Sequence, residues 1–343
     1  MIAPQSFPGD LGSIQLVAEA HEAERLHPVP AHWGRRIHLM WYGKGVSSIL
    51  RSKRWDMVHC WEEPYVFAGA QIAWLCGRGR RPVVFSTFQN ITKRYPPPFS
   101  QMEQFSIDRS AGWIAAGQTI LQSRLESGYG RKPHCAIPLG VDLQEFAPKP
   151  ESRAAVFARL EWPEHSPPVV GFIGRFVEEK GLRVLTQALD QCSEPWRAMF
   201  LGGGPLEAFL KTWAEPYGDR VRIVPGVPHA EIPVFLNAMD LLCAPSQTAL
   251  HWREQFGRML IEAFACGVPV IASDSGEIPF VVGDAGKILP ESDIGGWART
   301  IDDVLHDPFT RKLMSAAGLN RAHAEFDWIK IGARHVEFFE SLL

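Results

Sequence analysis

The sequence predicts an α/β protein made of two doubly wound domains, each a parallel sheet with helices on both faces. Two observations lead to this prediction. Short apolar runs typical of buried strands alternate with segments of helical periodicity along most of the chain. The alternation is interrupted at 139–168, a stretch rich in Pro, Glu and Arg, and then starts again. Because ligands of such sheets bind beyond the carboxyl ends of the strands, a cleft between the two facing domains is the expected site.

In the first half of the chain, the alternation becomes regular after residue 45. The segment before it is difficult to assign: 1–4 has the pattern of the end of a strand, and 13–26 fits a helix or, in its first residues, a strand. The expected elements that follow are a short helix at 49–53, strands at 56–61, 83–87, 112–116 and 135–138, and helices at 65–76, 101–110 and 120–127.

The second half repeats the same pattern. The expected strands are 169–173, 198–201, 221–224, 241–244 and 270–272, and the expected helices are 181–190, 206–214, 232–239 and 256–266. The final segment is amphipathic and predicts one more helix. We therefore expect a first domain at 1–148, a second domain at 149–326 and a C-terminal helix at 327–343.

Length and composition bound the class of protein. A chain of 343 residues with 46% apolar and 21% charged residues is typical of a globular protein of two ordinary domains. No apolar run approaches the roughly 18 residues that span a bilayer, and the first residues lack the pattern of a signal peptide. The six cysteines are scattered without a C-x-x-C pair, which predicts reduced, mostly buried thiols in a cytoplasmic protein. No metal-ligand spacing is present.

The charge is unevenly distributed along the chain. Between Arg25 and Lys132 there are 16 Lys and Arg against 6 Asp and Glu, although the net charge of the whole chain is −3. Tryptophans and other aromatic residues are interleaved with these charges. One interpretation is an anionic partner, and the absence of a nucleic-acid motif favours a membrane surface or a lipid phosphate over nucleic acid. The other interpretation is an ordinary solvated face with core aromatics.

The stretch 245–275 holds two carboxylates eight residues apart. Glu262 falls in the second turn of the helix expected at 256–266, and Glu254 falls in the loop before it. Gly257 between them would allow a ligand close to the helix N-terminus, where free N–H groups suit a phosphate. One interpretation is a nucleotide-sugar site. The other is a surface pair of Arg258 with Glu262, while Glu254 is simply solvated.

Several other short motifs lie along the chain on either side of these two carboxylates. Their order and spacing over about 150 residues resemble the family 4 glycosyltransferases, which have the GT-B fold and the Glu-x7-Glu motif. The matching runs are 138–142, 174–181, 202–205, 227–233, 254–262 and 275–279.

The resemblance implies roles for individual residues. Arg175 and Lys180 match the basic pair that holds the donor pyrophosphate, where cations stabilise the charge that builds on the leaving group. Glu254 matches the carboxylate that contacts the donor sugar, and Glu262 matches the one that accepts hydrogen bonds from the ribose. The remaining positions implied to bind the donor are Gly174, Gly203, Val227, Phe256, Gly257, Arg258 and Met259.

The chain also departs from the family pattern. Where the family has a His that points at the donor sugar, this chain has Gln89 followed by Asn90, and a Gln cannot carry a proton at neutral pH. Phe280 replaces a common acidic residue. The glycine-rich loop that follows the first strand in the family is either degraded here to 7–12 or absent, which predicts an incomplete N-terminus.

The activity implied by the resemblance is a retaining transfer of a sugar from a UDP- or GDP-linked donor to a glycan or polyprenyl-linked acceptor, in polysaccharide or glycoconjugate assembly. The donor would bind the second domain, the acceptor the basic first domain, and the last helix would cross back to the first domain. No metal or cofactor is implied. The expected location is the cytoplasm, and the basic first domain would allow peripheral attachment to the anionic inner face of the plasma membrane. Two alternatives stay open: a nucleotide-sugar 2-epimerase of similar fold, and a pseudoenzyme that binds the nucleotide-sugar.

Overall fold

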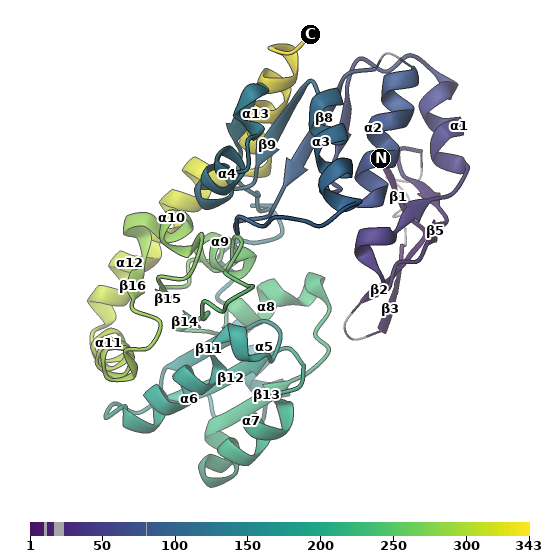
Figure 1. The fold of residues 1–343 in the computed structure, drawn as a ribbon. Helices are drawn as coiled ribbons and strands as arrows, with labels where there is room; N and C mark the ends of the chain where they lie inside the picture. Colours follow the sequence, from purple (N-terminus) through teal and green to yellow (C-terminus); the bar gives the residue numbers. More distant parts are fainter. Residues whose placement is uncertain (10–11, 17–23, 80) are drawn as a thin grey trace. The chain divides into compact units, whose positions relative to one another are not determined.

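The computed structural model describes residues 1–9, 12–16, 24–79 and 81–343. The chain divides into two compact units. Unit 1 holds Met1–Ile137 together with Arg334–Leu343, and unit 2 holds Pro138–Ala333. Figure 1 traces the elements of both. Each unit is described by itself below.

Unit 1 contains a parallel four-stranded sheet in the order β10-β9-β8-β7. Its central strands are fully buried because they are apolar on both faces, as in Val84, Phe85 and Trp113. The strands are β7 (Val58–Cys60), β8 (Val83–Thr87), β9 (Gly112–Ala115) and β10 (His134–Ala136), and the helices are α1 (Gly45–Ser52), α2 (Phe67–Arg78), α3 (Phe99–Arg109) and α4 (Gln118–Glu126). The alternation expected from residue 49 onward is therefore present.

The start of unit 1, where a glycine-rich loop is expected to be degraded or absent, consists of short paired strands. Strand β1 (Ile2–Pro4) pairs in parallel with β4 (His27–Val29). It is followed by β2 (Ser6–Gly9), which pairs antiparallel with β3 (Gly12–Gln15). Of the segment 7–12, the described residues 7–9 and 12 thus belong to a two-stranded antiparallel ribbon, and 10 and 11 lie outside the described residues. Of the segment 13–26, the described part begins as a strand, and 17–23 also lie outside the description.

A second short ribbon follows in unit 1. Strand β5 (Ala31–His32) pairs antiparallel with β6 (Trp41–Tyr42), and the ring of His32 stacks on that of Trp41 with centroids 4.4 Å apart. Tyr42 is buried, whereas Trp41 is exposed. The ribbon therefore presents one aromatic side chain to the core and the next to the surface, as the two-residue period of a strand requires.

Unit 2 contains a parallel six-stranded sheet in the order β13-β12-β11-β14-β15-β16. The chain starts in the middle at β11, runs outward to β13, then returns to the other side of β11 and runs outward again (Figure 1). The strand order thus reverses between β11 and β14, which makes the ends of these strands a topological switch point. The strands are β11 (Val169–Ile173), β12 (Arg197–Leu201), β13 (Val221–Val224), β14 (Leu241–Ala244), β15 (Val270–Ser273) and β16 (Lys287–Leu289).

Helices cover both faces of this sheet because alternate strand residues are apolar on opposite sides. Val170 and Phe172 face one core with α6 (Leu182–Gln191) and α11 (Ile294–His306), while Val169 faces the other core with α9 (Arg258–Ala265). The remaining α-helices of the unit are α5 (Ser152–Arg159), α7 (Glu207–Ala214), α8 (Ile232–Leu236), α10 (Ile278–Val282) and α12 (Pro308–Arg321). The sequence did not predict β16, which has only three residues.

The boundary between the units differs from the one expected after residue 148. Unit 2 begins at Pro138 because Val141 and Phe146 are buried in its core, and Val141 also forms a bridge with Asp327. At the other end, α13 (Trp328–Glu340) belongs to unit 2 in its first turns and to unit 1 from Arg334 onward. Within unit 1, Arg334 Nη2 donates to the carbonyl of Ala136 at 2.9 Å.

All six cysteines have free thiols. Four are buried, while Cys135 and Cys192 are half-buried. Burial raises the pKa of the thiols, to about 11 for Cys135 and about 12 for Cys192. The sequence-based expectation of reduced, mostly buried thiols is confirmed. In the part of the chain that the structure describes, no helix has the length and apolarity needed to cross a bilayer.

Candidate functional site

The loops that leave β11 and β14 interlock at the switch point of unit 2. Gly181, after β11, has φ of +69°, and a Cβ there would lie 1.8 Å from the carbonyl oxygen of Pro245, after β14. Only glycine fits this conformation and this approach. The two loops are therefore held together at a single distance, and the residues that flank Gly181 and Pro245 are fixed relative to each other.

The interlocked loops bring Lys180 and Glu254 together. Lys180 Nζ and Glu254 Oε2 are 2.5 Å apart, and the two side chains are only 14% and 8% exposed. Ser246 Oγ donates to the same carboxylate oxygen at 2.8 Å. The ammonium also lies 5.1 Å from the ring centre of Trp252. The alternative in which Glu254 is simply solvated is wrong, because its carboxylate is buried and paired.

The backbone of Glu254 is fixed as well. Its carbonyl accepts a hydrogen bond from Glu277 N at 3.0 Å. Gly276 has φ of +55°, and a Cβ there would lie 2.1 Å from that carbonyl oxygen. Because both the side chain and the main chain of Glu254 are engaged, its carboxylate is held ready in one orientation before any ligand arrives.

Glu262 lies where the sequence predicts, in the second turn of α9. The helix begins after Gly257, whose φ is +82°, so the free N–H groups of its first turn follow a residue without a side chain. The carboxylate is buried, and His229 Nε2 lies 3.0 Å from its Oε1. Arg258 is further away, at 3.6 Å, and exposed. The expected pair of Arg258 with Glu262 is therefore present, and Arg258 lies at the surface, but the carboxylate itself is buried.

His229 is a partner of Glu262 that sequence reasoning did not assign. It follows the matched Val227 and Pro228, but nothing in the sequence indicates that its ring meets a side chain 33 residues away. The hydrogen bond to Glu262 raises the pKa of His229, while its partial burial opposes this rise. The ring therefore binds the carboxylate more tightly when it is protonated.

Three glycines surround the loop after β11. Gly174 has φ of +155° and Gly202 has φ of +145°, and a Cβ at Gly202 would lie 1.9 Å from the carbonyl oxygen of Gly174. Gly203 accepts a hydrogen bond from Phe176 N at 2.8 Å. The positive φ of Gly174 and the close approach of Gly202 to its carbonyl thus explain these two glycines, while Gly203 contributes its main-chain carbonyl. Arg175 is exposed at the end of β11.

Three other residues that the resemblance implies to bind the donor pack against the core of unit 2. Phe256 is buried and meets Phe326 edge to face with centroids 6.1 Å apart, so its side chain belongs to the core. Val227 and Met259 are partly buried and pack against the same core. Any ligand contact of Phe256 would therefore involve its main chain, while Val227 and Met259 each keep some accessible surface.

Gln89 and Asn90 lie in unit 1, directly after β8, and both are buried. Gln89 Nε2 donates to the Tyr95 hydroxyl at 3.2 Å, and Gln89 Oε1 accepts from Ile91 N at 3.2 Å. The loop is further held by Glu63, which accepts from Thr87 Oγ1 at 2.8 Å and from Phe88 N at 2.7 Å. Sequence reasoning did not assign this anchoring role to Glu63, and burial raises the pKa of its carboxyl group.

Within the described ranges, no three His, Cys, Asp or Glu side chains gather in a way that could hold a metal ion. The switch point of unit 2 instead combines two cations, Arg175 and Lys180, with two buried carboxylates and the start of a helix. Such a set can bind a polyanion at the cations and N–H groups and accept hydrogen bonds from hydroxyl groups at the carboxylates.

Comparison with known proteins matches residues 157–321 to the family model described as "Glycosyl transferases group 1". The chain is 31% identical to a GDP-mannose-dependent alpha-(1-6)-phosphatidylinositol monomannoside mannosyltransferase of Mycolicibacterium smegmatis, over 76% of this chain and 70% of that protein. It is 30% identical to a GDP-mannose-dependent monoacylated alpha-(1-6)-phosphatidylinositol monomannoside mannosyltransferase of Corynebacterium glutamicum, over 97% of this chain and 91% of that protein.

Solved structures share the fold. HepE of Anabaena in complex with UDP superimposes with a TM-score of 0.73 at 20% identity, over 92% of this chain and 86% of that chain. A glycosyltransferase of Rickettsia africae gives a TM-score of 0.70 at 17% identity, over 87% and 80%.

Proposed function

Because this chain belongs to the group 1 glycosyl transferases and has the GT-B fold, we propose that it moves a sugar from a nucleoside-diphosphate donor to a lipid-linked or glycan acceptor with retention of configuration. The observation that carries this proposal is the buried Lys180–Glu254 pair at the switch point of unit 2. A cation and a carboxylate held together there match the two parts that a donor brings close to each other, an anionic pyrophosphate and a neutral sugar ring whose hydroxyl groups can donate hydrogen bonds.

Each part of the donor would bind a different set of residues in the site. Its pyrophosphate binds Arg175, Lys180 and the first N–H groups of α9, while the ribose hydroxyls donate to Glu262 and the sugar hydroxyls donate to Glu254. Lys180 thereby exchanges part of its interaction with Glu254 for the phosphate. Val227 would contribute main-chain contacts to the base. Each exchange replaces one charge-assisted hydrogen bond with another, so little interaction is lost when the ligand enters.

In the reaction, the bond between the anomeric carbon and the phosphate oxygen breaks, and a bond from the same carbon to the acceptor oxygen forms. The departing nucleoside diphosphate gains negative charge, which Arg175 and Lys180 stabilise. The acceptor proton passes to the departing phosphate, so no separate protein base is required and Gln89 need not carry a proton. The same two cations would neutralise the charge without a metal ion.

GDP-mannose is the first donor to test, because two similar proteins that cover most of the chain are named as GDP-mannose-dependent. The same names make an inositol-bearing lipid the first acceptor to test, ahead of a polyprenyl-linked glycan. The role would be in glycoconjugate or polysaccharide assembly, at the cytoplasmic face of a membrane.

The decisive experiment incubates the protein with GDP-mannose or UDP-glucose and a phosphatidylinositol mannoside, and follows the product by mass spectrometry and its anomeric configuration by NMR. Transfer with retention supports the proposal. Inversion at the anomeric carbon overturns the mechanism. Donor isomerised without an acceptor would indicate an epimerase, and tight nucleotide binding without transfer to any acceptor would indicate a pseudoenzyme.

A further inference from the structure

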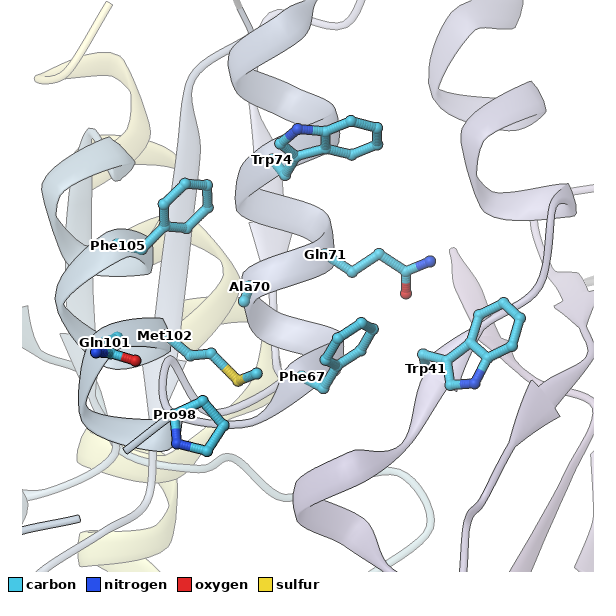
Figure 2. Close-up of a pocket in the computed structure, with 9 residues that line it drawn as sticks. All are labelled: Trp41, Phe67, Ala70, Gln71, Trp74, Pro98, Gln101, Met102 and Phe105. Atoms are coloured by element: carbon cyan, nitrogen blue, oxygen red, sulfur yellow. The ribbon is translucent and has the colours of Figure 1, made fainter. Parts of the chain in front are cut away.

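Unit 1 carries an apolar groove that no part of the proposed reaction uses. It has a volume of about 700 Å³ and lies between α2, α3 and the edge of β6. Figure 2 shows Phe67 and Gln71 projecting from α2 toward Trp41, and the Met102 side chain extending from α3 toward Phe67. Trp41, Phe67 and Trp74 are 37%, 40% and 48% exposed. Large apolar side chains that share one exposed groove indicate a binding surface.

The groove offers few hydrogen-bonding groups. Gln71 is the polar side chain at its centre, but both ends of its amide are engaged by the backbone of Tyr42. Gln71 Nε2 donates to the Tyr42 carbonyl at 2.7 Å, and Gln71 Oε1 accepts from Tyr42 N at 2.8 Å. The other polar lining residue, Gln101, is exposed at the surface. The interior of the groove therefore suits a hydrocarbon better than a sugar or nucleotide, which needs several polar partners.

A second groove of about 620 Å³ adjoins the first and shares Trp41, Gln71 and Trp74 with it. Its character is different, because four of its lining residues are basic and none of its described lining residues is acidic. The basic residues are Lys44, Arg51, Arg78 and Arg81.

The basic residues keep their charge available. Arg51 bonds to the backbone carbonyl and hydroxyl of Ser47, both neutral groups, and the guanidinium of Arg78 lies 4.9 Å from the ring centre of Trp74. Within the part of the chain that the structure describes, none of the four pairs with a carboxylate. A cationic rim next to an apolar groove is complementary to an anionic head group joined to a hydrocarbon chain.

We propose that these two grooves form a lipid site, in which one acyl chain of an anionic phospholipid lies along the apolar groove and its phosphate lies on the basic rim. Trp41 and Trp74 line both grooves and would sit at the junction of chain and head group, the position that tryptophan favours at membrane interfaces. The inference deepens the proposed membrane association. It concerns binding alone, so it stands or falls separately from sugar transfer.

The test titrates the protein with lysophosphatidylglycerol carrying octanoyl, decanoyl or dodecanoyl chains, below the concentration at which each lipid aggregates, by calorimetry. At about 0.8 kcal/mol per buried methylene, affinity should rise roughly tenfold or more for each two carbons added. Binding of monomers is essential here, because a lipid site takes single molecules whereas adsorption to a membrane surface needs an assembled one.

Two variants fill the apolar groove. Ala70→Trp from α2 and Gln101→Trp from the exposed face of α3 should each lower affinity for the dodecanoyl lipid at least about tenfold, the loss expected when roughly two methylenes can no longer be buried. Ala154→Trp is the matched control, since Ala154 is exposed on α5 of unit 2. If both filling variants bind the lipid as well as wild type, the acyl-chain site is overturned.

The basic rim is tested by the double variant Arg51→Gln/Arg78→Gln. At about 1 kcal/mol per basic residue near an anionic group, its affinity should fall roughly 30-fold. Arg131→Gln is the control, because Arg131 is exposed in the same unit but its charge is paired with Asp108 at 2.9 Å. Equal affinity for the zwitterionic lysophosphatidylcholine would overturn the assignment of the phosphate.

Thermal unfolding followed by circular dichroism is the fold check for every variant, because the groove and rim substitutions lie in unit 1 and nucleotide binding at unit 2 would not report on its folding. Lipid binding and sugar transfer are measured separately, which separates the two proposals. Lipid binding without sugar transfer would contradict only the proposed function. Sugar transfer with no monomer binding, or with binding independent of chain length, would contradict only the lipid site.

Discussion

The two units concentrate charge in opposite ways. In unit 2, the two carboxylates at the switch point are buried and paired before any ligand is present: Glu254 with Lys180, and Glu262 with the half-exposed His229. In unit 1, the cations on the rim of the groove are mostly exposed and have no acidic partner among the described lining residues. A small ligand of defined shape binds more tightly when the side chains that contact it are already oriented. The lipid proposed for unit 1 has a variable chain and head group, and would instead meet mostly exposed cations beside an apolar surface.

This contrast is tested most strongly by removing the cation of the buried pair. In Lys180→Ala, kcat/KM for sugar transfer should fall about 10²-fold or more, because one preorganised group that stabilises the leaving phosphate is lost and Glu254 is left buried without its ion pair. Steady-state kinetics with the donor varied measure this loss. Lys211→Ala is the control, since Lys211 is exposed and pairs only with Glu207 one turn away. Turnover of Lys180→Ala within threefold of wild type would contradict the role.

Removing the ribose carboxylate should affect binding more than turnover. In Glu262→Ala, the donor KM should rise about 10- to 100-fold, the range for losing hydrogen bonds to a charged group, with a smaller change in kcat. Glu215→Ala, an exposed carboxylate of the same unit, should leave both constants unchanged. A fall in kcat at constant KM would assign Glu262 to the transition state instead.

Ligand binding should also distinguish the units. A nucleoside diphosphate at ten times its Kd should slow the exchange of protected amides around β11, β14 and α9 about tenfold, because binding stabilises the closed form of the unit that holds it. Amides of β8 and β9 in unit 1 should be unaffected by the nucleotide alone. Hydrogen exchange followed by mass spectrometry gives both values in one experiment. Equal protection of amides in both units would contradict the prediction that the nucleotide binds unit 2 alone.

The smallest expected effect is the pH dependence caused by His229. Its hydrogen bond with Glu262 raises the pKa of His229, Glu145 adds to the rise, and Arg258 opposes it. The pair therefore stabilises the protein at pH values below the ordinary pKa of His, and this contribution is lost as pH rises through the raised value. Because the protonated ring competes with ribose for Glu262, the donor KM should be higher at low pH.

Since His229 is about half exposed, the change in donor KM between pH 5.5 and 8 should be modest, about two- to fivefold. It should disappear in His229→Asn, which keeps a hydrogen-bond donor and removes the titration. His306→Asn is the control, because His306 is more exposed and pairs with Glu194 outside the site. The same pH dependence in His229→Asn would show that another group causes it.

Sequence reasoning was most successful for the candidate site residues that follow the strands of unit 2. The alternation of apolar runs and helical segments was enough to predict a doubly wound domain, and the family resemblance of the motifs after the strands singled out Lys180, Glu254 and Glu262. The sequence could not indicate that Lys180 and Glu254 touch, because they are 74 positions apart and meet only through the close approach of Gly181 to Pro245. His229 was missed for the same reason.

Unit 1 was less predictable because its two grooves depend on how side chains are arranged at the surface. The excess of basic residues was visible in the sequence, and so were the tryptophans, but their separation into an apolar groove and a basic rim is a property of α2, α3 and β6 together. The short ribbons at the start of the chain gave no periodic signal, since strands of two to four residues are too brief to show one.

The thiols of this protein have a practical consequence for measuring its motions. A thiolate is the reactive form of cysteine, and the raised pKa of Cys135 and Cys192, the two least buried thiols, leaves almost none of it at neutral pH. We therefore expect the native protein to react only slowly with maleimides and with thiol-reactive spin labels. A cysteine introduced at an exposed position in each unit, such as Ala154 and Gln104, could be labelled selectively, and the distance between two probes could be followed as nucleotide is added.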